Sequence, residues 1–511
     1  MGSERIFKTD KRIRLGIWGL GRGGRLADNA RLLNIDIVAG CDIHPHMRET
    51  FAQAFPEAFV TADEDEFLAR DFDAVLIATY LPDHAKHILK ALAADKHILC
   101  EVTPFGTPAD GVRVVEAVEK SGKIFNLLEN YPFTRENSYV RKLWREGFFG
   151  DFMYGEGCYV HECRVLQYAY NVSGGLPIEP GYHLHNWRSI LNIHHYCTHS
   201  LGPVMCITGL RPVEVSAFPC DVRLPGHMSG GTACPSMIRM SNGGLFRNLM
   251  GATTNDRHFE LRLWGTNASM ENIHELKIRV GACGGGPLLN VKADWSELAD
   301  IAGKTEHNGG DFWELYYFAR EFLTGEPAPW DVYSAADATL AGIMAGRSEE
   351  NGGKPLPIPD FRNPAERDAY RGDDVSSPAP FDPERIFPEG HDPKLTGHFN
   401  TVMAKLYPLY PLSGIPVWHM ALDGMKIYDD IADEAGKMRI VENVGRLIHC
   451  LPELAENCLL ARKIAEAYPD SCPGVMLRGV LADIDPDRIL NVEATRKELQ
   501  AWLDSRYAEA K

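Results

Sequence analysis

The sequence predicts three parts: an α/β domain of the doubly wound Rossmann type, an α+β domain with an open and mostly antiparallel sheet, and a C-terminal helical extension. Three observations predict this fold class. Strand-like and helix-like segments alternate over residues 12–130, and a glycine-rich turn, GLGRGG, fills residues 19–24 directly after the first strand-like run. Long helical patterns then return in residues 395–511.

The first part alternates strands and helices at the spacing of βαβ units. Short apolar runs typical of buried strands occupy residues 12–18, 35–42, 73–79, 97–101 and 123–130. Apolar residues recur at helical spacing in residues 25–33, 84–96 and 111–122. Because each strand is followed by a helix, the strands are expected to be parallel. We assign residues 1–132 to this domain.

The second part has a different pattern. Short strand-like runs at 152–160, 212–220, 244–253 and 259–266 are separated by glycine and polar turns. This pattern favours a mostly antiparallel sheet with helices on one side. Helical patterns at 311–325 and 332–350 are expected to complete the domain, which we assign to residues 133–365.

The last part begins with a segment rich in proline, aspartate and glycine, residues 351–394, which we interpret as a linker or wrapping arm. We assign residues 366–394 to the linker and 395–511 to a separate helical extension. Its helices carry an apolar stripe: Leu447, Leu451, Leu454, Leu459 and Ile464. An isolated helix cannot bury such a stripe, so we expect it to pack on the other domains or across a subunit interface.

Composition excludes some classes of function. The chain has 511 residues and a formal net charge of −17, which disfavours nucleic acid or an anionic membrane as its main partner. No run approaches the ~20 apolar residues of a membrane-spanning helix, and no signal-peptide core precedes the first strand. The 12 cysteines contain no CxxC pair, which favours reduced thiols in a cytoplasmic protein.

The glycine turn has the GxGxxG spacing: Gly19, Leu20, Gly21, Arg22, Gly23 and Gly24. It lies between a strand and a helix, the context in which this motif binds a dinucleotide. We expect Gly21 to let the backbone approach the pyrophosphate, and Gly24 to permit close packing of the helix. Asp42 ends the second strand, where a carboxylate accepts hydrogen bonds from a ribose diol and repels a 2′-phosphate. The predicted cofactor is therefore NAD rather than NADP.

Two further segments carry a family resemblance. Residues 79–84 (TYLPDH) and 96–101 (KHILCE) resemble the glucose–fructose oxidoreductase and inositol dehydrogenase superfamily (Gfo/Idh/MocA). Most members have Glu-Lys-Pro after the fourth strand and use its lysine in catalysis, whereas this chain has Glu101-Val102-Thr103-Pro104. The resemblance implies further contacts with NAD from Ile43, Thr79, Leu81, His84, Glu101, Val102, Asn130 and Tyr333, the last of these as a cap on the nicotinamide. For Tyr333, the alternative is a core aromatic residue.

One branch of that superfamily also lacks the lysine: the NAD-dependent glycoside hydrolases typified by α-N-acetylgalactosaminidase. The chain is similar to this branch at residues 101–102, 128–130, 155–161, 196–203 and 331–336. The resemblance covers roughly residues 12–361. It implies oxidation of a sugar hydroxyl, elimination of the aglycone, addition of water and return of the hydride.

Histidine and tyrosine in the branch motif are the candidate catalytic residues. Tyr196 and His199 are three positions apart, so one helical turn would bring them to the same face as an acid–base pair. His161 is a weaker candidate. For His199 the alternative is a buried histidine that satisfies a main-chain carbonyl.

Other polar and aromatic residues are candidates for binding the substrate. Arg164 could bind sugar hydroxyls or an anionic group, although a surface ion pair is equally expected. Trp187 and Arg188 could form a sugar platform, although a core tryptophan is an equal alternative. Five histidines cluster in sequence: His183, His185, His194, His195 and His199. No carboxylate or cysteine stands at ligand spacing beside them, so we predict no metal.

Three functions remain open from the sequence. The first is a redox-neutral, NAD-dependent glycosidase, and the second is an NAD-dependent sugar or cyclitol dehydrogenase that releases NADH. The absent lysine favours the first, while Cys197 and Ser200, which depart from the branch motif, keep the second open. The third is a non-enzymatic NAD-sensing or assembly protein, suggested by the helical extension. In each case we expect a homo-oligomer whose small-molecule partner is a sugar or glycoside.

Overall fold

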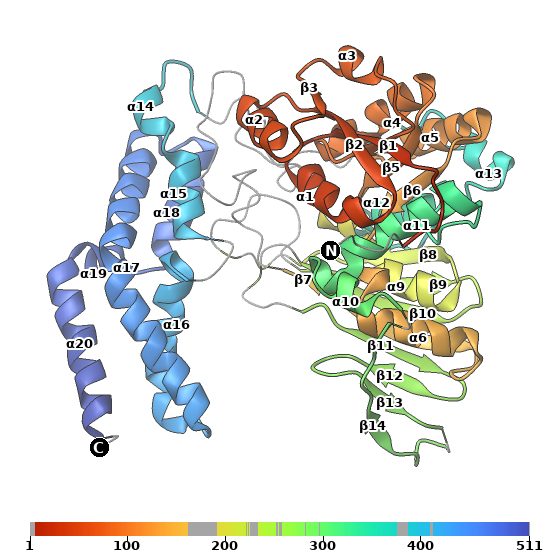
Figure 1. Ribbon diagram of the computed structural model, residues 1–511. Helices are drawn as coiled ribbons and strands as arrows, with labels where there is room; N and C mark the ends of the chain where they lie inside the picture. Colours follow the sequence, from red (N-terminus) through yellow and green to blue (C-terminus); the bar gives the residue numbers. More distant parts are fainter. Residues whose placement is uncertain are drawn as a thin grey trace.

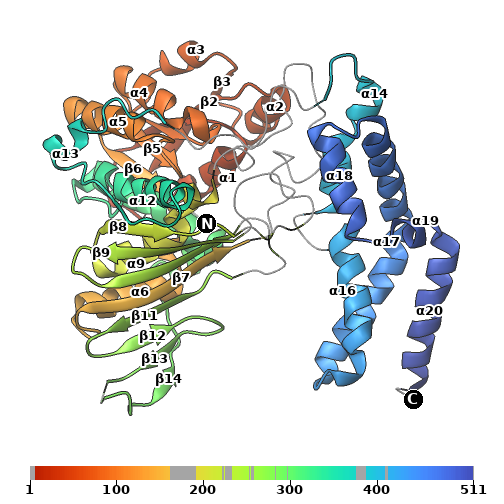
Figure 2. The same ribbon diagram turned by 180° about the vertical axis from the view of Figure 1, so that it is seen from behind.

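Two sheets and a bundle of helices make up the protein (Figures 1 and 2). The computed structural model describes residues 6–161, 192–220, 233–251, 258–281, 283–295, 297–375, 387–408 and 412–509, together with residues 222, 224 and 254. Within this part of the chain, no helix is both long and apolar enough to span a membrane.

The first sheet has six parallel strands in the order β3-β2-β1-β4-β5-β6. Their bounds are Ile13–Trp18 (β1), Ile35–Cys41 (β2), Phe59–Thr61 (β3), Ala74–Ile77 (β4), His97–Glu101 (β5) and Phe125–Leu128 (β6). The strand order reverses between β1 and β4. In such sheets a ligand crevice forms at this point, outside the carboxyl ends of the strands. The expected Rossmann domain is therefore confirmed.

Helices connect these strands on both faces of the sheet. The main ones are α1 (Arg22–Asn29), α2 (Pro45–Ala54), α4 (His84–Ala93) and α5 (Pro108–Ser121), with α3 (Glu64–Leu68) as a short turn. Local sequence explains the ends of α5. The Thr107 hydroxyl accepts from the Asp110 amide, proline occupies the first helical position, and Gly122 ends the helix with φ +63°.

The second sheet has nine strands in the order β14-β13-β12-β11-β7-β10-β9-β8-β15. Its central strands are β7 (Phe152–Val160), β8 (Pro212–Ala217), β9 (Cys234–Met240), β10 (Leu245–Gly251) and β11 (Leu261–Gly265). The outer strands are β12 (Ser269–Glu271), β13 (Lys277–Arg279), β14 (Leu288–Asn290) and β15 (Leu356–Pro357). Only the β7–β10 pair is parallel among the described pairings, so the prediction of a mostly antiparallel sheet is confirmed.

Helices of the second domain join it to the first. They are α6 (Arg135–Arg145), α9 (Thr198–Thr208), α10 (Ala299–Ala302), α11 (Gly310–Thr324) and α12 (Val332–Glu350), with the 3₁₀ turns η3 (Tyr131–Phe133), η4 (Ile193–Tyr196) and η5 (His307–Gly309). One hydrophobic core extends through both sheets. Two glycines permit close approach. A Cβ at Gly310 would lie 2.4 Å from the Asn130 carbonyl oxygen, and one at Gly342 would lie 2.3 Å from the His194 carbonyl oxygen.

The segment after α12 returns to the Rossmann domain as a strap, which we define as residues 351–375. It includes β15, which pairs with β8, and α13 (Pro364–Asp368). Arg367 makes two hydrogen bonds to Glu119 of α5, and Arg371 makes two to Glu116. The first part of the expected linker, residues 366–375, is therefore bound to α5. Residues 376–386 lie outside the described residues.

The C-terminal helices have a core of their own. They are α14 (Pro393–Thr396), α15 (Phe399–Leu406), α16 (Gly414–Ile427), α17 (Glu434–Ala467), α18 (Cys472–Ala482), α19 (Pro486–Leu490) and α20 (Val492–Glu509). The stripe residues Leu447, Leu451, Leu454 and Ile464 are buried in that core, whereas Leu459 is 41% exposed. The expectation that this stripe packs on another domain or subunit was wrong, because neighbouring helices of the extension bury it.

Candidate functional site

The glycine turn connects β1 to α1 at the carboxyl edge of the first sheet. Gly19 has φ +92°, and a Cβ there would lie 2.3 Å from the Ala78 carbonyl oxygen. A Cβ at Gly21 would meet no atom within 4 Å, so the turn is open where a pyrophosphate would approach. Helix packing depends on Gly23, whose Cβ would lie 2.8 Å from Ile17 Cγ2. At Gly24 the nearest atom is 3.7 Å away, so the role predicted for Gly24 was wrong.

Asp42 follows β2 beside this turn. Its carboxylate accepts hydrogen bonds from the Leu20 and His44 main-chain amides, each at 2.8 Å, which fixes its orientation. A carboxylate has roughly four lone-pair positions, so capacity remains for a ribose diol. Next to it the Ile43 side chain is 65% exposed and could cover an adenine ring.

Arg22 begins α1 and joins the two domains. Its guanidinium donates two hydrogen bonds to Asp311 of α11, at 2.8 and 2.9 Å, and one to Glu101 of β5, at 2.9 Å. Burial alone would lower the pKa of Arg22, but the charges of Glu101 and Asp311 outweigh it and raise this pKa. Burial would raise the pKa of Asp311, but hydrogen bonds from His307 and Arg22 lower it. The side chains of Arg22 and Glu101 are thus engaged in a fixed network beside the glycine turn.

Two buried side chains near this network, Glu314 and Asn130, have polar atoms without a hydrogen-bond partner among the described residues. Glu314 of α11 is 3% exposed, and neither carboxyl oxygen has a hydrogen-bond partner among the described residues. Burial, with the charges of Asp311 and Glu101, raises the pKa of Glu314 well above its usual range. Asn130 donates to Asp311 at 2.9 Å, while its Oδ1 is buried and has no partner among the described residues. An Asn130 contact with the cofactor would use this oxygen.

The loops after β4 and β5 hold the remaining predicted cofactor residues. Both ring nitrogens of His84 face main-chain carbonyls, those of Thr103 at 2.9 Å and Thr79 at 3.2 Å. His84 is also buried, so it positions these loops. Leu81 is buried beside Tyr80 and Tyr196, which links the first domain to the candidate catalytic tyrosine. Val102 is buried as well.

A buried dyad forms where the two domains meet. Nδ1 of His199, in α9, lies 2.8 and 3.0 Å from the two carboxylate oxygens of Glu129, which directly follows β6. A carboxylate only accepts hydrogen bonds, so Nδ1 donates and the lone pair of the neutral imidazole is on Nε2. Glu129 is not among the candidate residues that the sequence predicts. Its position in the segment 128–130, which resembles the hydrolase branch, was the available signal.

Tyrosine rings surround His199. The ring centroids of Tyr131 and Tyr159 lie 4.7 Å from that of His199, and the centroid of Tyr196 lies 4.4 Å from it. Tyr196 ends η4 and His199 is in α9, so the pair is brought together across two consecutive helical segments. The His161 ring lies farther out, 6.0 Å from that of Tyr159. The site therefore contains a histidine, the candidate base, in contact with three tyrosine rings.

Tyr333, another predicted site residue, does not join this site. The Tyr333 hydroxyl donates to Glu119 at 2.7 Å, near the end of α5 that is opposite the cofactor edge. This placement contradicts the predicted cap on the nicotinamide. Arg164, Trp187 and Arg188 lie outside the described residues.

Among the residues that the structure describes, two groups of side chains have the composition of metal ligands. The first, Glu306, His307 and Asp311, already surrounds the Arg22 guanidinium, which would repel a cation. The second, His194, Cys234 and Glu349, contains no arginine or lysine.

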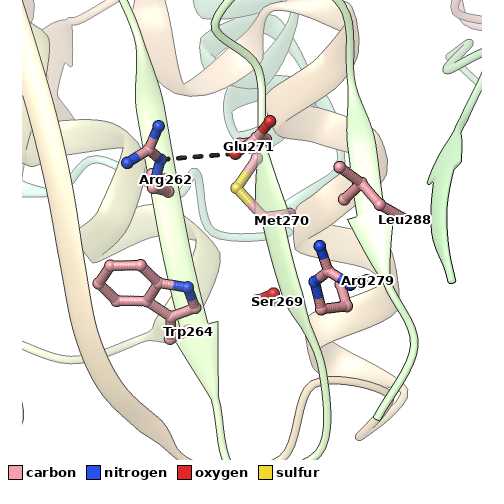
Figure 3. Close-up of a pocket in the computed structure, with 7 residues that line it drawn as sticks. All are labelled: Arg262, Trp264, Ser269, Met270, Glu271, Arg279 and Leu288. Carbon is pink, nitrogen blue, oxygen red and sulfur yellow. Dashed lines mark ion pairs between the residues drawn. The ribbon is translucent and has the colours of Figure 1, made fainter. Parts of the chain in front are cut away.

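A small cavity of about 250 Å³ lies on the outer strands of the second sheet (Figure 3). Its lining residues come from β11–β14, and Arg262 crosses it to Glu271 at 3.6 Å. None of these strands carries a predicted site residue, so this cavity is separate from the His199 site.

Comparison with known proteins agrees with this geometry. Residues 13–128 match the Gfo/Idh/MocA family model, described as an oxidoreductase family with an NAD-binding Rossmann fold. Residues 13–128 are thus similar to the NAD-binding domain of this family. The glycine turn and Asp42 lie within these residues, and Asn130, whose Oδ1 has no described hydrogen-bond partner, lies directly after them.

Similarity extends beyond the NAD-binding domain. A glycosyl hydrolase family 109 protein of Saccharopolyspora erythraea is 25% identical over 420 residues, which cover 73% of this chain and 88% of that protein. An alpha-N-acetylgalactosaminidase of Shewanella oneidensis is 26% identical over 406 residues, or 68% and 85% of the two chains.

Solved structures share the fold over about two thirds of this chain. Levoglucosan dehydrogenase, in complex with NADH and levoglucosan, has a TM-score of 0.57 and 17% identity, covering 68% of this chain and all of that one. The aldose-aldose oxidoreductase of Caulobacter crescentus has a TM-score of 0.54 and 17% identity, with the same coverage.

Proposed function

We propose that this protein is an NAD-dependent, sugar-active enzyme, and specifically a redox-neutral glycoside hydrolase. The observation that carries the proposal is the His199–Glu129 dyad, a buried base oriented by a carboxylate at the edge of an NAD-binding domain. Two relatives that this chain matches over 88% and 85% of their own length bear the names glycosyl hydrolase family 109 protein and alpha-N-acetylgalactosaminidase. These names support the hydrolase.

The residues present fit a bound NAD. Gly21 leaves the turn open, Asp42 has capacity for the ribose diol, and Asn130 Oδ1 has no partner among the described residues. The first turn of α1 adds main-chain amides and the positive end of the helix dipole, which favour a pyrophosphate. When bound, NAD would supply a hydride acceptor that can return the hydride in the same cycle.

His199 is the base for oxidation of a sugar hydroxyl. With Nδ1 donating to Glu129, Nε2 takes the hydroxyl proton as hydride leaves the same carbon. The carboxylate stabilises the imidazolium that results. In the final reduction, the protonated His199 returns this proton to the carbonyl oxygen.

The ketone makes the neighbouring C–H bond acidic, and loss of that proton expels the aglycone. Tyr196, in contact with His199, is the candidate second base: its phenolate form would take this proton, exchange it with solvent and give a proton back to the same carbon when water adds. Water then adds to the double bond, so the net reaction is hydrolysis without change in oxidation state. In place of the superfamily lysine stand Val102 and Thr103, so this segment carries no cationic acid.

The alternative is an NAD-dependent sugar or cyclitol dehydrogenase. Cys197 and Ser200 raised it because they depart from the branch motif. Cys197 Sγ donates to the Ala338 carbonyl and Ser200 Oγ to the Cys197 carbonyl, so both side chains have structural partners. Their departure from the motif therefore does not favour the dehydrogenase.

One experiment separates these activities. Purified protein is incubated in deuterated water with nitrophenyl glycosides and with free sugars, while nitrophenol and NADH are followed together. A hydrolase releases nitrophenol with no net NADH, and mass spectrometry finds deuterium on the ring carbon beside the transient ketone. Net NADH in proportion to product, or cleavage without ring deuterium, would reject the hydrolase; the first of these results would establish the dehydrogenase.

We further propose that the enzyme acts in the cytoplasm as a homo-oligomer. One face of the second sheet exposes Met237 on β9 and also carries a stacked pair, Tyr154 and Trp264, whose ring centroids are 4.9 Å apart. Methionine and aromatic residues are enriched at interfaces between proteins. Light scattering of the full chain tests this, and a monomeric mass at micromolar concentration would contradict it.

A further inference from the structure

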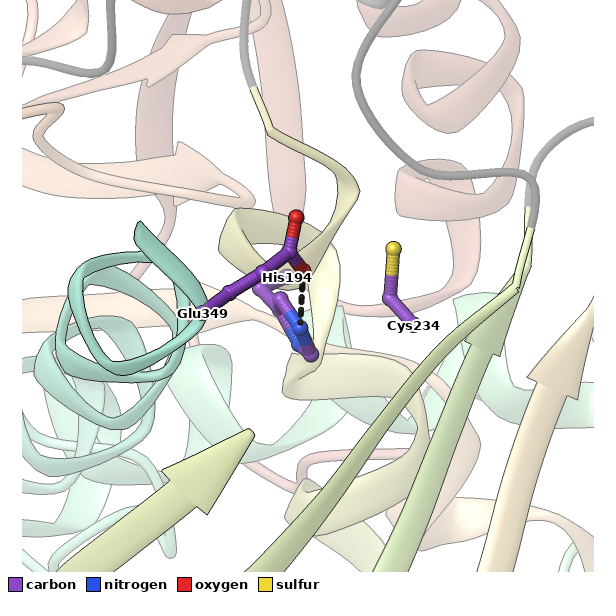
Figure 4. A group of neighbouring side chains, drawn as sticks. All are labelled: His194, Cys234 and Glu349. Carbon is purple, nitrogen blue, oxygen red and sulfur yellow. Dashed lines mark hydrogen bonds and ion pairs between the residues drawn. The ribbon is translucent and has the colours of Figure 1, made fainter. Parts of the chain in front are cut away.

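Three side chains with metal-binding chemistry meet outside the His199 site (Figure 4). His194 comes from η4, Cys234 from the first position of β9, and Glu349 from the last turn of α12. One ligand-type atom from each lies within 4.8 Å of the other two. His194 Nε2 and Glu349 Oε2 are 3.1 Å apart.

These separations suit a tetrahedral zinc ion. Zinc lies about 2.3 Å from thiolate sulfur and about 2.0–2.2 Å from histidine nitrogen or carboxylate oxygen. Tetrahedral geometry then separates the ligand atoms by roughly 3.3–3.7 Å. The His194–Glu349 contact is already close to this value, and small side-chain rotations bring the sulfur into range.

Burial and charge also favour a cation. His194 and Cys234 are fully buried, and the Glu349 side chain is 14% exposed. A thiolate and a carboxylate together balance the two charges of Zn²⁺, so the occupied site is neutral and avoids the cost of a buried net charge. His194 Nδ1 is buried without a hydrogen-bond partner among the described residues, so the ring can turn toward an ion without breaking a second bond.

We propose that His194, Cys234 and Glu349 bind one zinc ion, with the fourth position left for water or another ligand. The proposal reverses our expectation of no metal, which considered only ligands close in sequence. The ion would tie η4 to β9 and α12. Because Tyr196 ends η4 and His199 follows in α9, zinc would also fix the position of the candidate catalytic pair.

The test measures metal directly on the full-length protein without an affinity tag. After chelation and gel filtration, zinc is titrated in competition with a chromophoric chelator, and the retained metal is counted by mass spectrometry. We expect one zinc per chain. Cobalt(II) in its place should give intense d–d bands typical of four-coordination and a near-ultraviolet thiolate charge-transfer band, which reports a cysteine ligand.

Variants assign the ligands. Cys234→Ser and Glu349→Gln should each weaken zinc binding by at least about 100-fold, because residues that only support a ligand already change affinity by about 10–100-fold. The controls are Cys283→Ser, at an exposed cysteine, and Glu350→Gln, at the exposed residue next to Glu349. Both should bind zinc as tightly as the unmodified protein does.

Several results would overturn the proposal. They are absence of tight zinc binding to the unmodified protein, bound cobalt without the charge-transfer band, or full affinity in either Cys234→Ser or Glu349→Gln. Because the cobalt spectrum is taken on the unmodified protein, it decides the question even if a variant fails to fold.

Discussion

Glu129 and His199 lie 70 residues apart in sequence and contact each other through both carboxylate oxygens, at 2.8 and 3.0 Å. Glu129 is fully buried and His199 nearly so. Glu129→Gln keeps the size and shape of the side chain. It removes the negative charge that stabilises the His199 imidazolium and fixes the tautomer of His199. We expect kcat to fall by about 10²–10⁴-fold, as for His199→Ala, with little change in the NAD dissociation constant. Retention of more than a tenth of the activity in Glu129→Gln would show that the dyad is structural.

Substitution of two glycines in the same turn, Gly21 and Gly23, should have different effects, one on NAD binding and the other on stability. Gly21→Ala places a methyl group where no protein atom lies within 4 Å, so it should leave the melting temperature unchanged while weakening NAD binding. Gly23→Ala places one 2.8 Å from Ile17 Cγ2, so it should destabilise the fold by about 1–3 kcal/mol. Calorimetry with and without NAD checks both variants. Equal losses of stability would contradict the assignment of separate roles.

Asp42 should set the preference for NAD. Its carboxylate is oriented by two main-chain amides and would repel a 2′-phosphate. Asp42→Ala should weaken NAD binding by about 10–100-fold, the equivalent of one hydrogen bond to a charged group, and should reduce the difference in affinity between NAD and NADP. Asp36→Ala, also on β2 but paired with Arg12, is the control. Tighter binding of NADP than NAD to the unmodified protein would refute the assignment.

The raised pKa of Glu314 predicts a dependence of stability on pH. Above about pH 4.5 the unfolded chain has lost this proton while the native protein retains it. Unfolding therefore becomes easier as pH rises, by up to about 1.4 kcal/mol per pH unit, until the native carboxyl also ionises. Glu314→Gln should flatten the fall of the melting temperature from pH 5 to 8. The exposed Glu326→Gln serves as control, and identical profiles for both variants would exclude a neutral Glu314.

The separate core of the C-terminal helices predicts that they can be removed. A chain ending at residue 375 keeps the strap and should melt like the first two domains of the full protein. A chain ending at residue 350 loses the two Arg367–Glu119 hydrogen bonds and the β15–β8 pairing, so it should melt at lower temperature. Thermal unfolding followed by light scattering compares the two. Aggregation of the longer chain would instead show that the extension covers the catalytic domains.

The Rossmann domain could be predicted because its signals are local. Strands, helices and the GxGxxG turn repeat within short windows, and the position of Asp42 after β2 follows from the strand pattern. The role predicted for Gly24 was wrong because that prediction also rested on local spacing alone. Motif spacing cannot tell which glycine of a turn faces the sheet, and the position of Ile17 assigns this contact to Gly23.

The catalytic and metal groupings depend on contacts between distant segments. His199 was recognisable within its own segment, but its partner Glu129 follows a strand of the other domain. Tyr333 looked suitable in sequence, yet its helix carries it to Glu119, at the far end of α5. His194 and Glu349 are 155 residues apart, and only the packing of α12 on η4 brings them together. Sequence by itself determined the local elements and the cofactor, whereas side-chain partnership was decided by tertiary packing, because no local pattern encodes which helix faces which strand.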